Sequence, residues 1–193
     1  MESGITFELQ RAASTRGRRG DVASWVGQVG GLGRIELSFP TEHSDYPAEY
    51  CEVAVVGESF PLVTYLGLRY LRRPLLAEGE LRVDWEPADL HRGAYRLGRK
   101  GRALRIHIKD RSYTYAQVGG KRSHELARQG AGVLMRRSGW NNPRTLVGSC
   151  SGTADALDIG LAVVLEAVYT RNLTLPGAVV SMPGRFLNRC NFL

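Results

Sequence analysis

Apolar and polar residues alternate along most of the first 150 residues, which is the period-two pattern of strands that bury one face. One stretch, Leu62–Arg73, fits either an amphipathic helix or two short strands broken at Gly67. Ala13–Asp21 is polar and predicts a loop. The glycines of Gly27–Gly33 predict turns. They do not fit a phosphate-binding loop, because such a loop is followed by a helix, whereas a strand follows these glycines. The alternating runs predict strands over Ile5–Gln10, Arg34–Phe39, Tyr50–Val56, Gly79–Trp85, Leu104–Lys109, Ser112–Val118, Lys121–Arg128 and Gly132–Arg137.

The pattern changes in the stretch from Thr153 to Arg171, where apolar residues cover most of the circumference of a helix and Glu166 is the polar exception in the centre. A helix of this kind has protein on every side. Its apolar part is shorter than the roughly 20 residues that a bilayer requires. We therefore expect an enclosed helix over about 153–172, with Ser151 or Thr153 as its N-cap.

Together these patterns predict a mainly β (α+β) fold, in which an antiparallel β-barrel of many short strands wraps around a buried hydrophobic C-terminal helix. The strands would occupy about residues 4–150, and an irregular tail would follow the helix over 173–193. A chain of 193 residues is long enough for one such core and short for two. We therefore expect a single domain, 1–193.

The local structure is best defined between Leu104 and Val118. We expect Asp110 and Arg111 to form a two-residue hairpin loop. The expected cross-strand pairs are Ile108 with Tyr113 and Ile106 with Tyr115, which are favourable pairs of β-branched and aromatic residues. One wall of this hairpin is then apolar, and the other is basic and polar.

Charge adds a candidate binding surface. The net charge is +7, and only three of the 26 basic residues are lysines. Because such a bias is typical of a GC-rich genome, the distribution of the charges is more informative than their number: twelve basic residues against two acidic ones lie between Arg96 and Arg137. The residues that could line one basic surface are Arg96, Arg99, Lys100, Arg102, Arg105, Lys109, Arg111, Lys121 and Arg122.

This surface predicts binding of anionic phospholipid headgroups or another phosphate-containing ligand. Nucleic acid remains an alternative partner for the same surface. It is the less favoured one, because single strands bind where exposed aromatic side chains lie beside cations, whereas the hairpin tyrosines Tyr113 and Tyr115 are expected on the apolar wall. A solvated charged surface without a ligand is the simplest interpretation of all.

Catalytic and metal sites receive little support from the residues. Gly148–Gly152 resembles a nucleophile elbow with Cys150 as the nucleophile, but all four histidines precede it, whereas the hydrolase pattern requires one after it. A hydrolase remains the less favoured alternative. An anion site at the same helix N-terminus would be opposed by Asp155 and Asp158. We expect no catalytic residues, no cofactor and no metal.

The expected location follows from the cysteines and the N-terminus. Cys51, Cys150 and Cys190 are odd in number and widely spaced, which fits a reducing cytoplasm better than a disulfide framework. The first residues have no basic region followed by an apolar run, so we expect no secretory signal. The chain is therefore expected to be cytoplasmic, without a transmembrane segment and at most peripheral to a membrane.

The order of elements resembles the tubby C-terminal-like superfamily, which includes phospholipid scramblases and related plant and bacterial domains. The resemblance rests on the hairpin GRALRIHIKDRSYTYAQV, the short strands after it and the run TADALDIGLAVVLEAVYT. It covers roughly Ile5 to Thr174. It implies a barrel around a central hydrophobic helix, and it implies a non-enzymatic protein, such as a bacterial member of unassigned activity, that binds anionic lipid through basic residues.

Overall fold

The computed structural model describes residues 4–12, 15–17, 20–39, 49–70, 73–77, 79–92, 103–120, 122–139 and 143–170. Its elements are β1 (Thr6–Arg11), β2 (Thr15–Gly17), β3 (Gly20–Gln28), η1 (Gly30–Leu32), β4 (Arg34–Phe39), β5 (Tyr50–Gly57), β6 (Val63–Tyr70), β7 (Arg73–Pro74), β8 (Glu80–Val83), β9 (Glu86–Pro87), β10 (Asp89–Arg92), β11 (Leu104–Ile108), β12 (Arg111–Gln117), β13 (Ser123–Arg128), β14 (Ala131–Arg137), β15 (Thr145–Gly152) and α2 (Ala156–Ala167). The tail predicted over 173–193 lies outside these residues.

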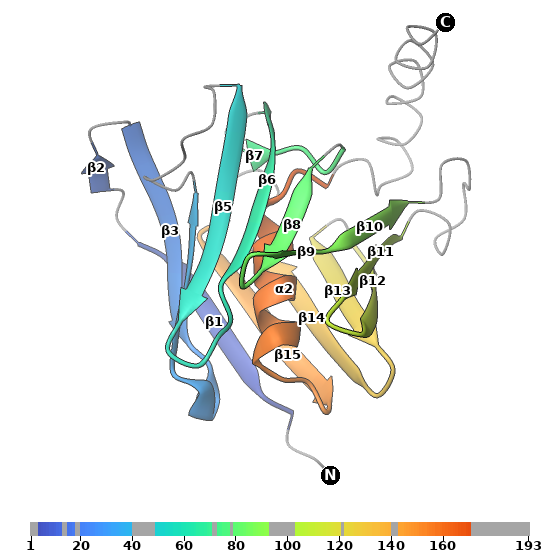
Figure 1. The fold of residues 1–193 in the computed structure, drawn as a ribbon. Helices are drawn as coiled ribbons and strands as arrows, with labels where there is room; N and C mark the ends of the chain where they lie inside the picture. Colours follow the sequence, from blue (N-terminus) through green and yellow to red (C-terminus); the bar gives the residue numbers. More distant parts are fainter. Residues whose placement is uncertain are drawn as a thin grey trace, which may run out of the picture.

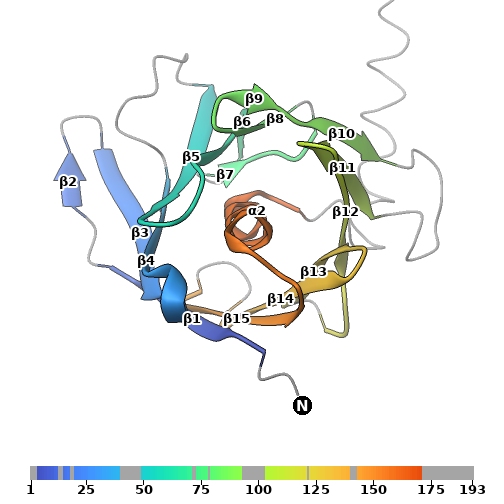
Figure 2. The same cartoon turned by 60° about the horizontal axis from the view of Figure 1, so that its bottom comes forward.

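The strands form one antiparallel sheet that curls into a nearly closed barrel around α2 (Figure 1). The hydrogen-bonded order within the described residues is β10-β11-β12-β13-β14-β15-β1-β3-β4-β5-β6-β8-β9, with β2 and β7 as side branches on β3 and β6. β9 and β10 end this path although they are neighbours in the sequence, so the seam of the barrel lies between them. Figure 2 shows α2 inside the ring of strands. The predicted fold class is confirmed.

The core consists of the inward faces of the strands packed against the whole surface of α2. Every residue from Asp158 to Ala167 is buried, and Val164 has no exposed surface. On β5, Cys51, Val53 and Val55 point into this core, as the alternation predicts. The expectation of an enclosed helix is therefore confirmed.

The helix is shorter than predicted and has a different N-cap. Asp155, not Ser151 or Thr153, is the cap: its carboxylate accepts a hydrogen bond from the Asp158 amide, and the Asp158 carboxylate accepts one from the Asp155 amide. This reciprocal arrangement satisfies two otherwise unpaired N–H groups of the first turn. Thr153 lies two residues before the cap, and its amide still donates to the Gly130 carbonyl at the end of the β14–β15 pairing.

Three other expectations need correction. The predicted loop Ala13–Asp21 contains β2 and the start of β3. Leu62–Arg73 is neither a helix nor two strands, because β6 runs unbroken through Gly67. That glycine is required by the close approach of β7: a Cβ atom there would lie 2.6 Å from the Leu75 carbonyl oxygen. Gly27 does not serve a turn, because it lies within β3, packed against β1.

The β11–β12 hairpin has the predicted faces but a different register. The turn is formed by Lys109 and Asp110, whose φ angles are 48° and 61°, the left-handed pair of a type I′ hairpin turn. The observed pairs are Ile106 with Tyr113, Leu104 with Tyr115 and Ile108 with Arg111. Each residue has moved by two positions relative to its predicted partner, and an even shift leaves every side chain on the predicted side of the sheet.

The predicted strand Gly79–Trp85 is also too long. β8 ends at Val83, and Asp84 and Trp85 form the turn to β9 with φ angles of 49° and 72°. Trp85, through which the alternation of the predicted strand continues, is 73% exposed.

Candidate functional site

The structure places four of the nine residues of the predicted basic surface, and it places them in three different environments. Arg105 lies on β11, Lys109 and Arg111 lie at the β11–β12 turn, and Arg122 precedes β13. The others, Arg96, Arg99, Lys100, Arg102 and Lys121, fall outside the described residues.

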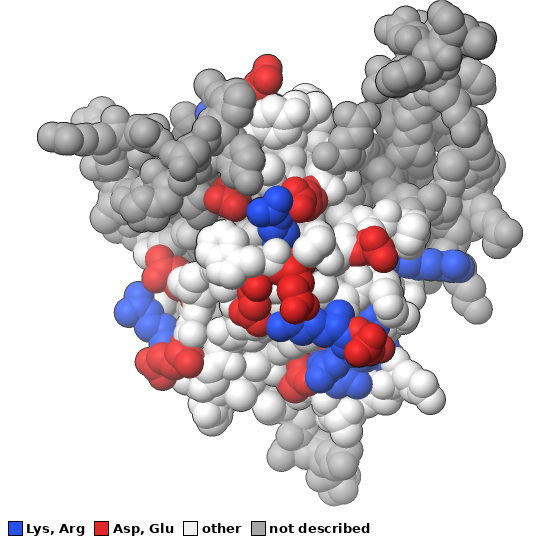
Figure 3. Space-filling view, viewed as in Figure 1, with Lys and Arg blue, Asp and Glu red and all other residues white. Residues whose placement is uncertain are grey.

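The two cations at the turn are held in ion pairs within the protein. Lys109 Nζ lies 2.6 Å from Asp84 Oδ2, and this hydrogen bond lowers the pKa of Asp84. Arg111 Nη1 lies 2.6 Å from Asp155 Oδ2 and 3.4 Å from Asp158 Oδ1, at the start of α2. In Figure 3 basic and acidic side chains are interspersed on this side of the molecule. The turn end is therefore close to neutral, and it does not form the continuous basic surface that the sequence predicts.

Arg105 has a different environment, on the outer wall formed by β10, β11 and β12. It lies directly opposite His91 on one side and Thr114 on the other, and its side chain is exposed. Among the residues that the structure describes, no carboxylate lies within 4.0 Å of it, unlike Lys109 and Arg111. This guanidinium is therefore available to an anionic ligand.

The next row of the same wall contains Asp89, His107 and Ser112, which lie side by side across β10, β11 and β12. His107 Nδ1 is 3.1 Å from Ser112 Oγ. Among the described residues, no ion pair joins Asp89 to His107. The row therefore adds an imidazole and a hydroxyl beside Arg105, together with one carboxylate that an anionic ligand must avoid. Arg122 lies apart, and its Nη1 donates to the Ser138 carbonyl at 3.3 Å.

Inside the barrel, a buried polar cluster surrounds Glu166 near the end of α2. Tyr115 donates its hydroxyl hydrogen bond to Glu166 Oε1 at 3.0 Å, and Arg137 Nε donates to Oε2. His124 Nδ1 lies 3.2 Å from Oε1, an electrostatic contact outside hydrogen-bond geometry, and its ring stacks on Tyr115. Burial alone would raise the pKa of Glu166, but Arg137 and His124 lower it to about 2. Glu166 is therefore ionised at neutral pH although its side chain is fully buried.

A second cluster holds the first turn of α2 against the same strands. Arg128 of β13 contacts both carboxylate oxygens of Asp158, with its Nη2 2.9 Å from Oδ2, and Tyr113 of β12 donates to Oδ1 at 3.0 Å. Asp158 and Glu166 are eight residues apart and so lie on one side of the helix. Residues of β12 to β14 form both clusters with the helix, so together the clusters fix the rotation of the helix about its own axis inside the barrel. These contacts position the helix.

The sequence analysis missed both clusters. A signal for one was present, because an ionisable residue in an otherwise apolar buried helix requires a partner. Its partners could not be named from the sequence, since Arg137 and Tyr115 are 29 and 51 residues away.

Cys150 does not lie on a strand-to-helix turn. The whole of Gly148–Gly152 belongs to β15, between β14 and β1, so it does not form a nucleophile elbow. Its side chain faces the core, where burial, with a smaller effect of Asp158, raises the pKa of the thiol to about 11. This environment suppresses the thiolate on which a cysteine nucleophile depends. Within the described ranges, no group of three or more His, Cys, Asp or Glu side chains could hold a metal ion.

Comparisons with family models, curated proteins and solved structures gave no match for this chain. No helix in the described part of the chain has the length and the apolar character to cross a membrane.

Proposed function

We propose that this chain is a non-enzymatic binding domain of the tubby type, which holds an anionic, phosphate-bearing ligand on the outer wall of β10, β11 and β12. The ligand would be a phospholipid headgroup or a free phosphate compound, and the protein would act in the cytoplasm at the periphery of an anionic membrane. The observation that carries the proposal is the environment of Arg105, an exposed guanidinium with donor groups on both neighbouring strands and no carboxylate partner among the described residues.

Guanidinium groups bind phosphate through two parallel N–H donors. Around Arg105, the Thr114 hydroxyl and the His91 ring supply further polar contacts from the same face. A rigid barrel holds these groups at fixed spacing, which lowers the entropic cost of binding. The ion pairs of Lys109 and Arg111 support the choice of this wall over the turn, because a ligand at the turn would have to displace carboxylates that are already bound.

The test is sedimentation with vesicles of phosphatidylcholine, alone or mixed with phosphatidylserine, using Arg105→Glu and Arg136→Glu. Arg136 is the control because it is exposed on β14, elsewhere on the barrel, and the charge change is identical. We expect retention on the mixed vesicles only, a several-fold loss for Arg105→Glu, and a much smaller loss for Arg136→Glu. Equal losses would mean that overall charge alone drives retention, and the assignment of this wall would be wrong.

Two further arms separate the possible sources of phosphate. Release of vesicle-bound protein by inositol hexakisphosphate would indicate that the wall recognises the phosphate group itself, and resistance to it would indicate that an extended lipid surface is needed. Binding to a DNA duplex with the same Arg105 dependence, in the absence of vesicle binding, would contradict the lipid proposal in favour of nucleic acid.

A further inference from the structure

Trp85, in the β8–β9 turn, is exposed to solvent and also has a backbone conformation that bulky residues avoid. Trp85 is 73% exposed, more than Val56, Tyr70 or Val147, the other large apolar side chains with substantial exposure in the described ranges. Its φ angle of 72° lies in the left-handed region, which glycine adopts freely and bulky residues avoid. Glycine or asparagine is the usual choice at this position of a type I′ turn. Neither the exposure nor the backbone conformation is explained by the fold of one chain.

The turn is held rigidly in this conformation. The Asp84 amide donates to the Leu62 carbonyl at 2.8 Å, and Asp84 Oδ1 accepts from the Leu62 amide at 3.0 Å. Asp84 Oδ2 is bound by Lys109 from the turn of the β11–β12 hairpin, across the seam of the barrel. An exposed aromatic side chain on a turn whose backbone is held in place has the properties of an anchor residue at a protein interface, because the backbone loses little conformational entropy on binding.

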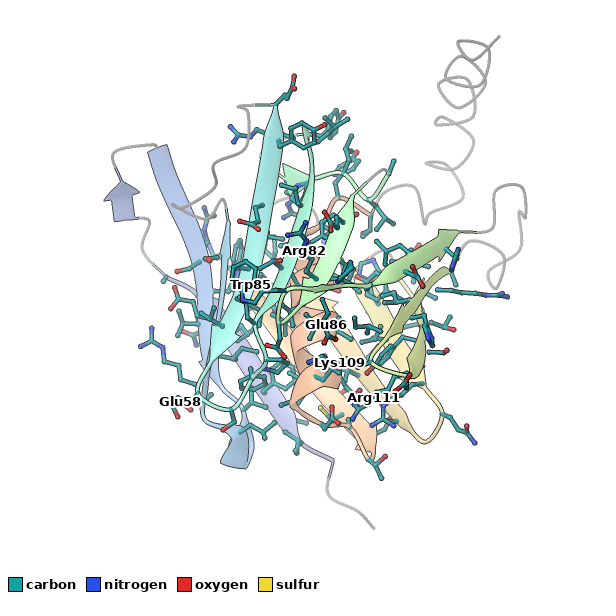
Figure 4. The ribbon with its side chains drawn as sticks, viewed as in Figure 1. Glu58, Arg82, Trp85, Glu86, Lys109 and Arg111 are labelled. Carbon is teal, nitrogen blue, oxygen red and sulfur yellow. The ribbon has the colours of Figure 1, made fainter. Side chains whose placement is uncertain are left out.

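Three of the cations on this side of the molecule are held in ion pairs, and Glu86 adds one acid without an ion-pair partner among the described residues. Arg82 is bound to Glu80, Lys109 to Asp84 and Arg111 to Asp155, and Glu86 lies next to Trp85 (Figure 4). The whole chain carries a net charge of +7, so two copies repel one another unless they meet through a neutral surface. An apolar centre with a rim of both charge signs is the composition of a protein interface.

We propose that two copies of this chain associate through the Trp85 turn, with Trp85 at the centre of the contact and the neighbouring ion pairs at its rim. A nearly balanced set of charges can be self-complementary about a two-fold axis, because acidic groups of one copy can meet basic groups of the other. The dimer would carry two Arg105 walls. The proposal does not rest on the anionic ligand, since its evidence comes from the turn alone.

The test is analytical ultracentrifugation of the full chain over a range of about 10 μM to 1 mM, which covers the weak association expected of a small contact. Three proteins are compared: wild type, Trp85→Gly and the control Val56→Ala, which removes exposed apolar surface from β5. We expect concentration-dependent dimerisation of wild type and Val56→Ala, and at least tenfold weaker association of Trp85→Gly. A wild type that stays monomeric, or a Trp85→Gly protein that dimerises like wild type, would overturn the proposal.

Thermal unfolding of dilute, monomeric samples shows whether Trp85 is needed for the stability of the single chain. Because glycine adopts a φ of 72° without strain, Trp85→Gly should unfold at the same temperature as wild type or a higher one. A clearly lower unfolding temperature would show that Trp85 is kept for the stability of the single chain, and the interface proposal would then lose its basis.

Discussion

The buried pair of Arg137 and Glu166 allows a quantitative prediction about what holds the helix in the barrel. Arg137→Met keeps an unbranched apolar stem and removes the guanidinium, so the Glu166 carboxylate stays fully buried without its cation. Breaking one side of a buried ion pair costs about 3–5 kcal/mol. The direction of the Glu166 pKa agrees with this: burial would raise it, but Arg137 and His124 lower it to about 2, so the folded protein stabilises the charged carboxylate.

Urea unfolding followed by circular dichroism measures this cost. For a domain of this size, a loss of about 3–5 kcal/mol also lowers the unfolding temperature by roughly 6–20 °C. The control is Arg136→Met, the same change at the exposed neighbouring residue, which should alter the free energy of unfolding by less than about 0.5 kcal/mol. If Arg137→Met were no more harmful than Arg136→Met, the cluster would not fix the helix and the reasoning would be refuted.

The double variant Arg137→Met/Glu166→Leu tests whether the cost arises from an uncompensated charge. Replacing both partners by apolar side chains of similar size removes the charge from the core, and such replacements are often close to neutral. We expect the double variant to be more stable than Arg137→Met alone. The two single changes should then be strongly non-additive, with a coupling energy of about 2 kcal/mol or more. Additive costs would contradict the direct pairing.

Lowering the pH should remove the stabilisation that the buried Glu166 carboxylate provides. The pKa of Glu166 is lower in the folded protein than in the unfolded chain, so its stabilisation is complete above pH 4.5 and is lost as the pH falls towards 2. Glu166→Gln lacks this titration. The difference in unfolding free energy between wild type and Glu166→Gln should therefore shrink from pH 6 to pH 3. A constant difference across this range would show that the charge of Glu166 does not contribute.

Three further predictions concern the core, the cap and the buried thiol. Val164→Asp should abolish cooperative unfolding in circular dichroism, because an unpaired charge would replace a side chain without exposed surface, and a folded variant would mean that the helix is not enclosed. Asp158→Asn should lower the free energy of unfolding by about 2–4 kcal/mol in urea titrations, since it removes the buried charge that Arg128 binds. A loss below about 1 kcal/mol would mean that this contact contributes no more than a surface ion pair does. In a Cys51→Ser/Cys190→Ser background, Cys150 should react with a thiol reagent at neutral pH much more slowly in the native protein than in urea, because it is buried with a pKa raised to about 11; equal rates would show an accessible thiolate.

Local patterns predicted the elements of the fold well, because alternation and helical periodicity reflect which face of each segment is buried. The predictions that were wrong concern features that depend on contacts between residues far apart in the sequence. The hairpin register follows from the left-handed conformation of Lys109, whose side chain is bound by Asp84 of another hairpin. The N-cap is Asp155, and Thr153 is still bound to the end of the β14–β15 pair.

The candidate site was predictable only in part. The sequence identified Arg105, Lys109 and Arg111 as neighbours in one hairpin. It could not show that Lys109 and Arg111 are neutralised by carboxylates 25 and 44 residues away, so these two cations add little net charge to the predicted surface. The predicted strand included Trp85 because the alternation continues through it, and the turn that exposes it is set by hydrogen bonds to Leu62.

The most direct test of the proposed function is an NMR titration of the isotope-labelled protein with a soluble phospholipid headgroup such as inositol trisphosphate. Binding at the outer wall of β10, β11 and β12 predicts saturable shifts of the amides around His91, Arg105 and Thr114, and their loss in Arg105→Glu. Shifts centred on the Lys109–Asp110 turn, or no shifts at millimolar ligand, would contradict the assignment of the anionic ligand to this wall.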